Sequence, residues 1–244
     1  MVDPRASATE LVREFERLFG PRLRSALLYG SVARGEAVEG VSDINVMVLL
    51  DRIDAEVLRS ASPAARRWVQ AGNTAPLLMA WNEWQRAEDA FAIELADMRD
   101  AHVVLHGADP LEGLAVQREA LRLQAERELR GKLLQLREGM LIAAEAEEDV
   151  GRLLLVALPS FVTYLRAALR LAGRAAPVES PAVIEQGAAL VGADPSAFLR
   201  TWEARARRTP LSARVDDALV AGYFDTAERT ADFVDNLPQE TVQE

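Results

Sequence analysis

The sequence predicts an α+β fold in which a small domain with a mixed β-sheet precedes an all-α helical bundle. Up to Asp109, short apolar runs of strand length alternate with longer amphipathic runs of helical period. After Asp109-Pro110 the apolar positions recur with helical spacing throughout. No internal repeat or low-complexity linker interrupts the 244 residues. We therefore expect a first domain over residues 1–109, a helical bundle over 110–238 and a frayed polar tail over 239–244.

The expected elements of the first domain follow from caps, breakers and apolar runs. A helix opens at Ser7 and ends before Gly20-Pro21. A second helix covers about 54–70, and Pro63 is expected to break it. Asn82 can cap a third, short helix. Strands are expected at 26–29, 41–50, 76–80, 92–96 and 103–105.

The remaining elements are all helical. One long helix is expected from about 111 towards 148, and another over 151–171. Ser180-Pro181 and Asp194-Pro195 each place a cap residue before a proline at the first helical position, so two further helices begin there. Ser212 can cap the last helix, which we expect to end near residue 236.

Composition excludes several classes of function. The chain has no cysteine, which excludes disulfides, thiolate metal sites and cysteine nucleophiles, and it has only two histidines. The net charge of −10 is spread over both halves, so a long nucleic acid is an unfavourable partner. No apolar run approaches the roughly 18 residues of a membrane span, and no secretory signal is recognisable at the N-terminus. We expect a cytoplasmic protein with no membrane partner.

A strand-to-helix turn near residue 30 has the features of a phosphate-binding loop. A buried strand ends at Gly30, which lacks a Cβ and lets a phosphate approach the backbone. Ser31 offers a hydroxyl and an N–H at the start of a short helix, where anions are favoured. Arg34 lies one helical turn further on and could reach the same phosphates.

A second polar pair follows at the start of the next strand. Asp43 and Asn45 are two residues apart, so on a strand they share a face, and Ile44 points to the core. Paired oxygen ligands of this kind suit Mg²⁺, a hard cation that bridges protein carboxylates and substrate phosphates. The two segments together predict a site for a metal ion and a triphosphate.

These residues resemble the nucleotidyltransferase superfamily of the DNA polymerase β type. Its signature is Gly-Ser, a spacer and then Asp-x-Asp or Asp-x-Glu, and here it is represented by Gly30-Ser31 and Asp43-Ile44-Asn45. The bacterial minimal and aminoglycoside-type enzymes are the subgroup that the chain looks like most, because in them a helical domain follows the catalytic one. The resemblance is specific over residues 27–50, weak near 91–98 and only architectural beyond Asp109.

The resemblance implies a role for each matching residue. Gly30, Ser31 and Arg34 would hold the nucleoside triphosphate, for which ATP is expected. Asp43, Asn45 and Glu94 would be the metal ligands. Asp43 and Glu94 would also be the catalytic acids, with Glu94 placed at mid-strand and helping to activate the attacking hydroxyl. Asp97, at odd spacing from Glu94 on that strand, should face the other way.

Asn45 departs from the family pattern, which usually has a carboxylate at that position. An amide can bind a metal ion through its oxygen but adds no charge, so weaker metal binding is expected. Each site residue also has an ordinary interpretation: a strand-to-helix turn at Gly30-Ser31, a polar residue on a solvated strand face for Asn45, an exposed acid for Glu94, and a surface ion-pair partner for Arg34.

Two functions therefore remain open from the sequence. The first is Mg²⁺-dependent transfer of a nucleoside monophosphate from an NTP to an acceptor hydroxyl on a cationic small molecule or a protein side chain. The second is a catalytically silent nucleotide-binding or partner-binding module of the same fold. The acceptor is unknown from the sequence, and a homodimer stays open.

Overall fold

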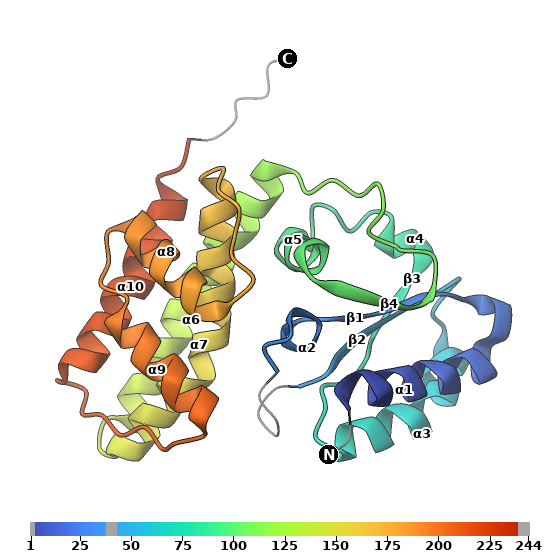
Figure 1. Ribbon diagram of the computed structural model, residues 1–244, viewed down its shortest axis with the longest axis horizontal. Coiled ribbons are helices and arrows are strands. Elements are labelled where there is room, and N and C mark those ends of the chain that lie inside the picture. The colour runs from blue at the N-terminus through green and yellow to red at the C-terminus, as the bar shows by residue number, and fades with distance from the viewer. Residues whose placement is uncertain (1–2, 38–42, 239–244) are drawn as a thin grey trace. The chain divides into compact units, whose positions relative to one another are not determined.

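The computed structural model describes residues 3–37 and 43–238 and divides into two compact units, Met1–Val116 and Gln117–Glu244. Residues 239–244, predicted as a tail, lie outside the described part. The first unit is α+β and the second is helical (Figure 1). The predicted fold class is therefore confirmed.

The first unit is built on a four-stranded mixed sheet in the order β3-β2-β1-β4. The central strand β1 is antiparallel to both β2 and β4, whereas β2 and β3 are parallel. Its elements in chain order are α1 (Pro4–Phe19), a 3-10 turn η1 (Gly20–Arg22), β1 (Leu23–Tyr29), α2 (Ser31–Arg34), β2 (Asn45–Leu50), α3 (Ala55–Gln70), β3 (Leu77–Ala80), α4 (Trp81–Trp84), α5 (Ala92–Asp100) and β4 (His102–Gly107).

Helices cover both faces of this sheet, with α1 and α3 on one face and α4 and α5 on the other (Figure 1). Side chains alternate along the strands, so Leu28 and Val48 pack into the core on the α1 and α3 face. Leu27 and Met47 point to the opposite face, where Leu95 of α5 is fully buried. The sheet is thus apolar on both sides, which explains why β2 reads as a continuous apolar run.

The second unit packs four helices against a central one. These are α6 (Arg118–Ala143), the central α7 (Glu147–Leu171), α8 (Ser180–Val191), α9 (Ser196–Arg207) and α10 (Ala218–Asp235). In its core, Phe161 of α7 makes an edge-to-face contact with Tyr223, whose hydroxyl donates to the Leu154 carbonyl over 3.2 Å. Within the described residues, α7 alone is long and apolar enough to span a membrane, which corrects the expectation that no run approaches that length. Most of its apolar stretch is buried among the other helices, as in a core helix.

One predicted strand is wrong. Residues 92–96 belong to helix α5, in which Ala92, Ile93, Leu95, Ala96 and Met98 are buried. A short apolar run does not by itself distinguish a strand from a buried helix. Alanine, leucine, methionine and glutamate are strong helix formers, and this composition favours the helix.

Other helix boundaries also differ from the prediction. Helix α3 runs through Pro63, which is exposed, so the predicted break is absent from this helix. Asn82 lies inside α4 and does not cap it, since the N-cap is Ala80. The long helix α6 begins at Arg118 and ends at Ala143, so it is shorter at both ends than expected.

The segment 108–116 is attached to the first unit. The Ser25 hydroxyl donates to the Ala108 carbonyl over 2.8 Å, and the Trp84 indole donates to the Pro110 carbonyl over 2.8 Å. Leu111 is buried in the core beneath α5. These contacts place the division between the units at Val116, a few residues after the predicted boundary.

Candidate functional site

One edge of the sheet gathers the predicted site residues of the first two strands. Tyr29, the last residue of β1, is paired in register with Asn45 on β2 and with His102 on β4. Strand β3 is parallel to β2 and begins at the same edge, since Met47 pairs with Leu77. The end of β1 and the starts of the other three strands therefore meet at one place, which we call the strand edge.

Gly30 makes the turn that leads from the strand edge into α2. Its φ of 79° and ψ of −154° lie in a region that is essentially restricted to glycine. A methyl group on Gly30 would lie 2.8 Å from Nδ2 of Asn45, so the amide of Asn45 rests against the glycine backbone. The next residue, Ser31, begins the four-residue helix α2 and is partly exposed. The turn thus places Gly30, the residue before Ser31, against Asn45.

Asp43 lies just before β2 and is exposed to solvent. Its Oδ2 accepts a hydrogen bond from the Thr74 hydroxyl over 2.9 Å, which links it to the loop that precedes β3. Ile44 is buried in the core shared with α1 and α3. Asn45 points to the other face, since it alternates with Val46 along the strand. The structure therefore places Asp43 and Asn45 at the same edge of the sheet.

Glu94 reaches this region from helix α5 and not from a strand. Tyr29 is partly buried on the α5 face of the sheet. Its burial and the negative charge of Glu94 raise the pKa of Tyr29 above its ordinary value. Tyr29 therefore lies on the face of the sheet that is covered by α5, the helix that contains Glu94. Asp97 is three residues from Glu94 on the helix, so the two acids share a side, and the expectation that they diverge is wrong.

Arg34 of α2 lies beside two carboxylates, and one of them, Asp97, belongs to α5. Its Nε lies 3.3 Å from Oε2 of Glu36, and its Nη1 lies 3.8 Å from Oδ2 of Asp97. Only 12% of the Arg34 side chain is exposed. The ion pair with Asp97 links the turn at Gly30-Ser31 to α5. Contact between Arg34 and a phosphate stays a prediction, and it would require Arg34 to share its donors with these acids.

The donor set at the strand edge fits one magnesium ion better than two. Within residues 3–37 and 43–238, no three histidine, cysteine or acidic side chains are gathered as metal ligands. Asp43 supplies one exposed carboxylate, and Asn45 adds an uncharged amide. Mg²⁺ commonly binds to one or two carboxylates and takes its other ligands from phosphates and water. Asp43 could therefore hold one ion brought by a triphosphate, but the set lacks the shared carboxylates of a two-metal centre.

Three residues at the strand edge were not selected from the sequence. Thr74 holds Asp43, Tyr29 lies next to Asn45, and His102 begins β4. The His102 ring nitrogens lie 2.8 Å from the Met98 carbonyl and 3.1 Å from Oδ2 of Asp109. Thr74 precedes a strand that is parallel to β2, and this pairing is not visible in the sequence. His102 carried no comparable pattern.

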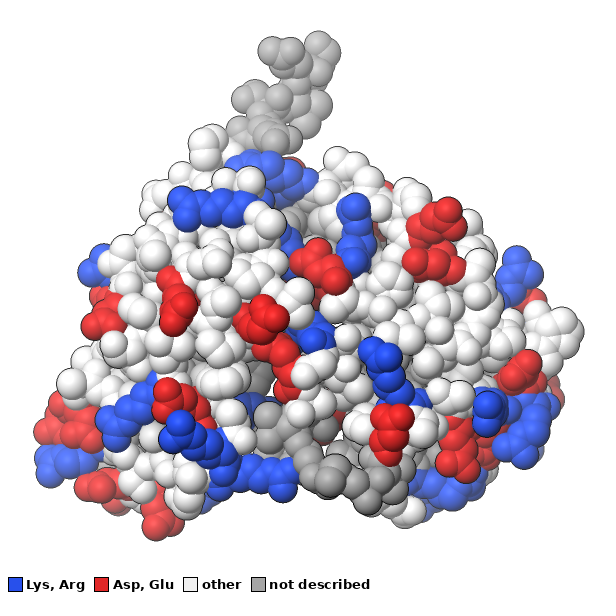
Figure 2. Space-filling view, in the orientation of Figure 1, with Lys and Arg blue, Asp and Glu red and all other residues white. Residues whose placement is uncertain are grey.

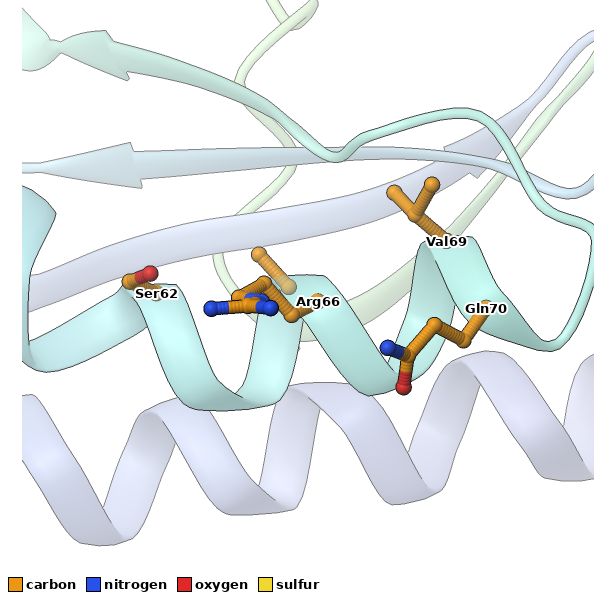
Figure 3. A pocket seen from close by; sticks show the side chains of 5 residues that line it. Ser62, Arg66, Val69 and Gln70 are labelled. Carbon is orange, nitrogen blue, oxygen red and sulfur yellow. The ribbon is translucent and has the colours of Figure 1, made fainter.

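A hollow on the outer surface of α3 is separate from these residues. It has a volume of about 300 Å³. Figure 3 shows four of the residues that line it, Ser62, Arg66, Val69 and Gln70, along α3. None of the predicted site residues lines it.

On the face shown in Figure 2, basic and acidic side chains are intermixed over both units. The side chains drawn on this face therefore form no continuous basic area that could bind a nucleic acid.

Comparison with known proteins supports the fold assignment. No protein-family model and no curated protein sequence matches the chain. A solved structure does match: spectinomycin adenyltransferase AAD(9) from Enterococcus faecialis, crystallised with ATP and spectinomycin. The identity is 11% and the TM-score is 0.55, and the match covers 91% of this chain and 98% of that one. The chain therefore shares the fold of an aminoglycoside nucleotidyltransferase, as the sequence resemblance predicted.

Proposed function

We propose that the chain binds a nucleoside triphosphate at the strand edge and transfers its nucleoside monophosphate to an acceptor hydroxyl. The observation that carries this proposal is the register between β1 and β2, which brings Gly30-Ser31 and Asp43-Asn45 to the same edge of the sheet. Because the chain shares its fold with an adenyltransferase that was crystallised with ATP, we propose ATP as the nucleotide that it binds.

Each residue at the edge has a part in this transfer. The Ser31 hydroxyl would donate to a phosphate oxygen. Glu94 would accept the proton of the acceptor hydroxyl, whose oxygen attacks the α-phosphorus while the bond to pyrophosphate breaks. A Mg²⁺ ion held by Asp43 and the phosphates would neutralise charge on the triphosphate. The protein itself contributes position and orientation, which supply much of the rate in phosphoryl transfer.

The acceptor is proposed to be a cationic small molecule. The net charge of −10 attracts cations and repels long polyanions. The adenyltransferase with the same fold was crystallised with spectinomycin, so aminocyclitols and aminoglycosides are the first acceptors to test, and a protein side chain is the next. A bacterial, cytoplasmic protein is consistent with such a substrate, and a homodimer stays a proposal.

The second candidate function is a nucleotide-binding module without catalysis. Asn45 favours it, because this residue removes a negative charge from the position where the family usually has a metal-binding carboxylate. Electrostatic stabilisation is commonly the largest contribution to catalysis, so the loss of one ligand charge can reduce the rate severely.

Transfer from ATP labelled at the α-phosphate separates the two functions. We expect label to appear in an aminocyclitol or aminoglycoside acceptor, and Glu94→Gln to lower that rate by about 100-fold, within the usual range for a general base. The thermal shift produced by ATP should persist in Glu94→Gln, because the triphosphate contacts remain. Glu56→Gln, an exposed site at the start of α3, is the matched control and should transfer at the parent rate.

The outcomes are distinct. A thermal shift with ATP but no transfer to any acceptor would favour the silent module. The absence of any response to ATP, with or without Mg²⁺, would contradict both functions.

A further inference from the structure

The side chain of Asn45 occupies the position from which a second metal ligand would act. Its Nδ2 lies against the Gly30 backbone, at 2.8 Å from the place of a methyl group on that residue. Within the described part of the chain, the Asn45 side chain forms no hydrogen bond, and it is partly exposed. An amide donor therefore faces the turn where the triphosphate is proposed to bind.

An amide and a carboxylate act on a phosphate in opposite ways. The NH₂ group of asparagine donates two hydrogen bonds, so it can bind a phosphate oxygen directly. A carboxylate only accepts, and it would repel the phosphate unless a cation lay between them. Replacing the carboxylate by an amide thus removes a repulsion and supplies a direct contact in its place.

The other charged groups near Gly30 also affect how a phosphate could bind there. Arg34 is held beside the turn by Glu36 and Asp97, so its charge is largely balanced within the protein. Asp43 is the acid on the β2 side of the edge, and the Thr74 hydroxyl already donates to it. A triphosphate at Gly30-Ser31 would thus meet one carboxylate next to β2, that of Asp43, where the family pattern has two, in addition to Glu94 on α5.

We propose that this site binds a nucleoside triphosphate without a divalent cation, with the Asn45 amide as a direct phosphate ligand. The proposal rests on the proposed function, because it assumes that the triphosphate lies at the strand edge. It concerns binding and not the rate of transfer, and it applies equally to an active enzyme and to a silent module.

The test is calorimetric titration of ATP into the full-length protein, in EDTA and in excess Mg²⁺. For the parent, we expect the two dissociation constants to agree within about threefold, which corresponds to less than 1 kcal/mol. For Asn45→Asp, we expect affinity in EDTA to fall by about tenfold or more, and Mg²⁺ to restore it. In this variant, Mg²⁺ would have to offset the negative charge that the new carboxylate adds.

Asn82→Asp is the matched control. It makes the same chemical change at an exposed position in α4, which follows β3 at the opposite edge of the sheet. This variant should keep the parent dissociation constants in both buffers. Thermal unfolding without nucleotide checks that Asn45→Asp folds as the parent does.

The possible results distinguish failure of this inference from failure of the proposed function. Tight ATP binding by the parent only in Mg²⁺ would overturn cation-independent binding and leave the proposed function standing. Equal losses in EDTA for the parent and Asn45→Asp would overturn the role of the amide. Failure to bind ATP in either buffer would overturn both this inference and the proposed function.

Discussion

Replacing Gly30 by alanine is expected to weaken ATP binding and to destabilise the first unit. The φ of 79° and ψ of −154° at this position are accessible essentially to glycine alone, and forcing another residue there costs about 1–3 kcal/mol. The new methyl group would also lie 2.8 Å from Nδ2 of Asn45 and displace that amide. Titration with ATP and urea unfolding measure the two effects, and we expect ATP affinity to fall at least about tenfold.

Gly35→Ala is the control for this change. Gly35 ends α2 with a φ of 78° and a ψ of 11°, and among the described residues a methyl group there would meet no atom within 4 Å beyond its chain neighbours. The left-handed conformation alone costs alanine about 1 kcal/mol, so this variant should be mildly destabilised and still bind ATP. Equal ATP affinity in Gly30→Ala and the parent would show that the nucleotide does not approach the strand edge at Gly30.

Asp43→Asn is expected to lower the rate of nucleotidyl transfer by about 100-fold or more, the size of effect seen when one electrostatic contact to a transition state is lost. The change leaves two amides and no carboxylate on the β2 side of the strand edge, so a magnesium ion would lose its anionic ligand from this strand. ATP affinity in EDTA should be unchanged or tighter, because the variant removes a charge that repels the phosphates. Labelled transfer and calorimetry measure the two quantities.

Thr74→Val separates the charge of Asp43 from its orientation. This variant removes the hydroxyl that donates to Oδ2 of Asp43 over 2.9 Å but leaves the carboxylate in place. We expect a rate loss of about tenfold, smaller than that of Asp43→Asn, because one hydrogen bond to the carboxylate is lost while its charge stays. Parent-like transfer by Asp43→Asn would rule out Asp43 as the catalytic metal ligand.

Local patterns were sufficient to predict much of the first unit. Strand β1 and the turn at Gly30 follow from an apolar run that ends in glycine. Helix α3 was predicted over about 54–70, and in the structure the Asp54 side chain caps it by accepting from the Val57 N–H over 2.9 Å. Helix α5 could not be predicted in this way. Its buried residues lie against the sheet face formed by Leu27 and Met47, and that long-range packing decides between helix and strand.

The site was predictable where chain neighbours form it and not where distant segments meet. The proximity of Gly30 and Asn45 could be predicted because β1 and β2 follow each other in the sequence and pair directly. The Thr74 contact depends on the crossover through α3, and the ion pair between Arg34 and Asp97 depends on the orientation of α5. Spacing along the chain contains no information about either contact.

The location of bound ATP tests the account most directly. A crystal structure of the full-length protein with ATP should show a phosphate oxygen within hydrogen-bond distance, about 2.7–3.2 Å, of the Asn45 amide nitrogen, and another near the Ser31 hydroxyl. Triphosphate density elsewhere, for example in the hollow on α3 lined by Arg66 and Gln70, would contradict the assignment of the strand edge as the nucleotide site.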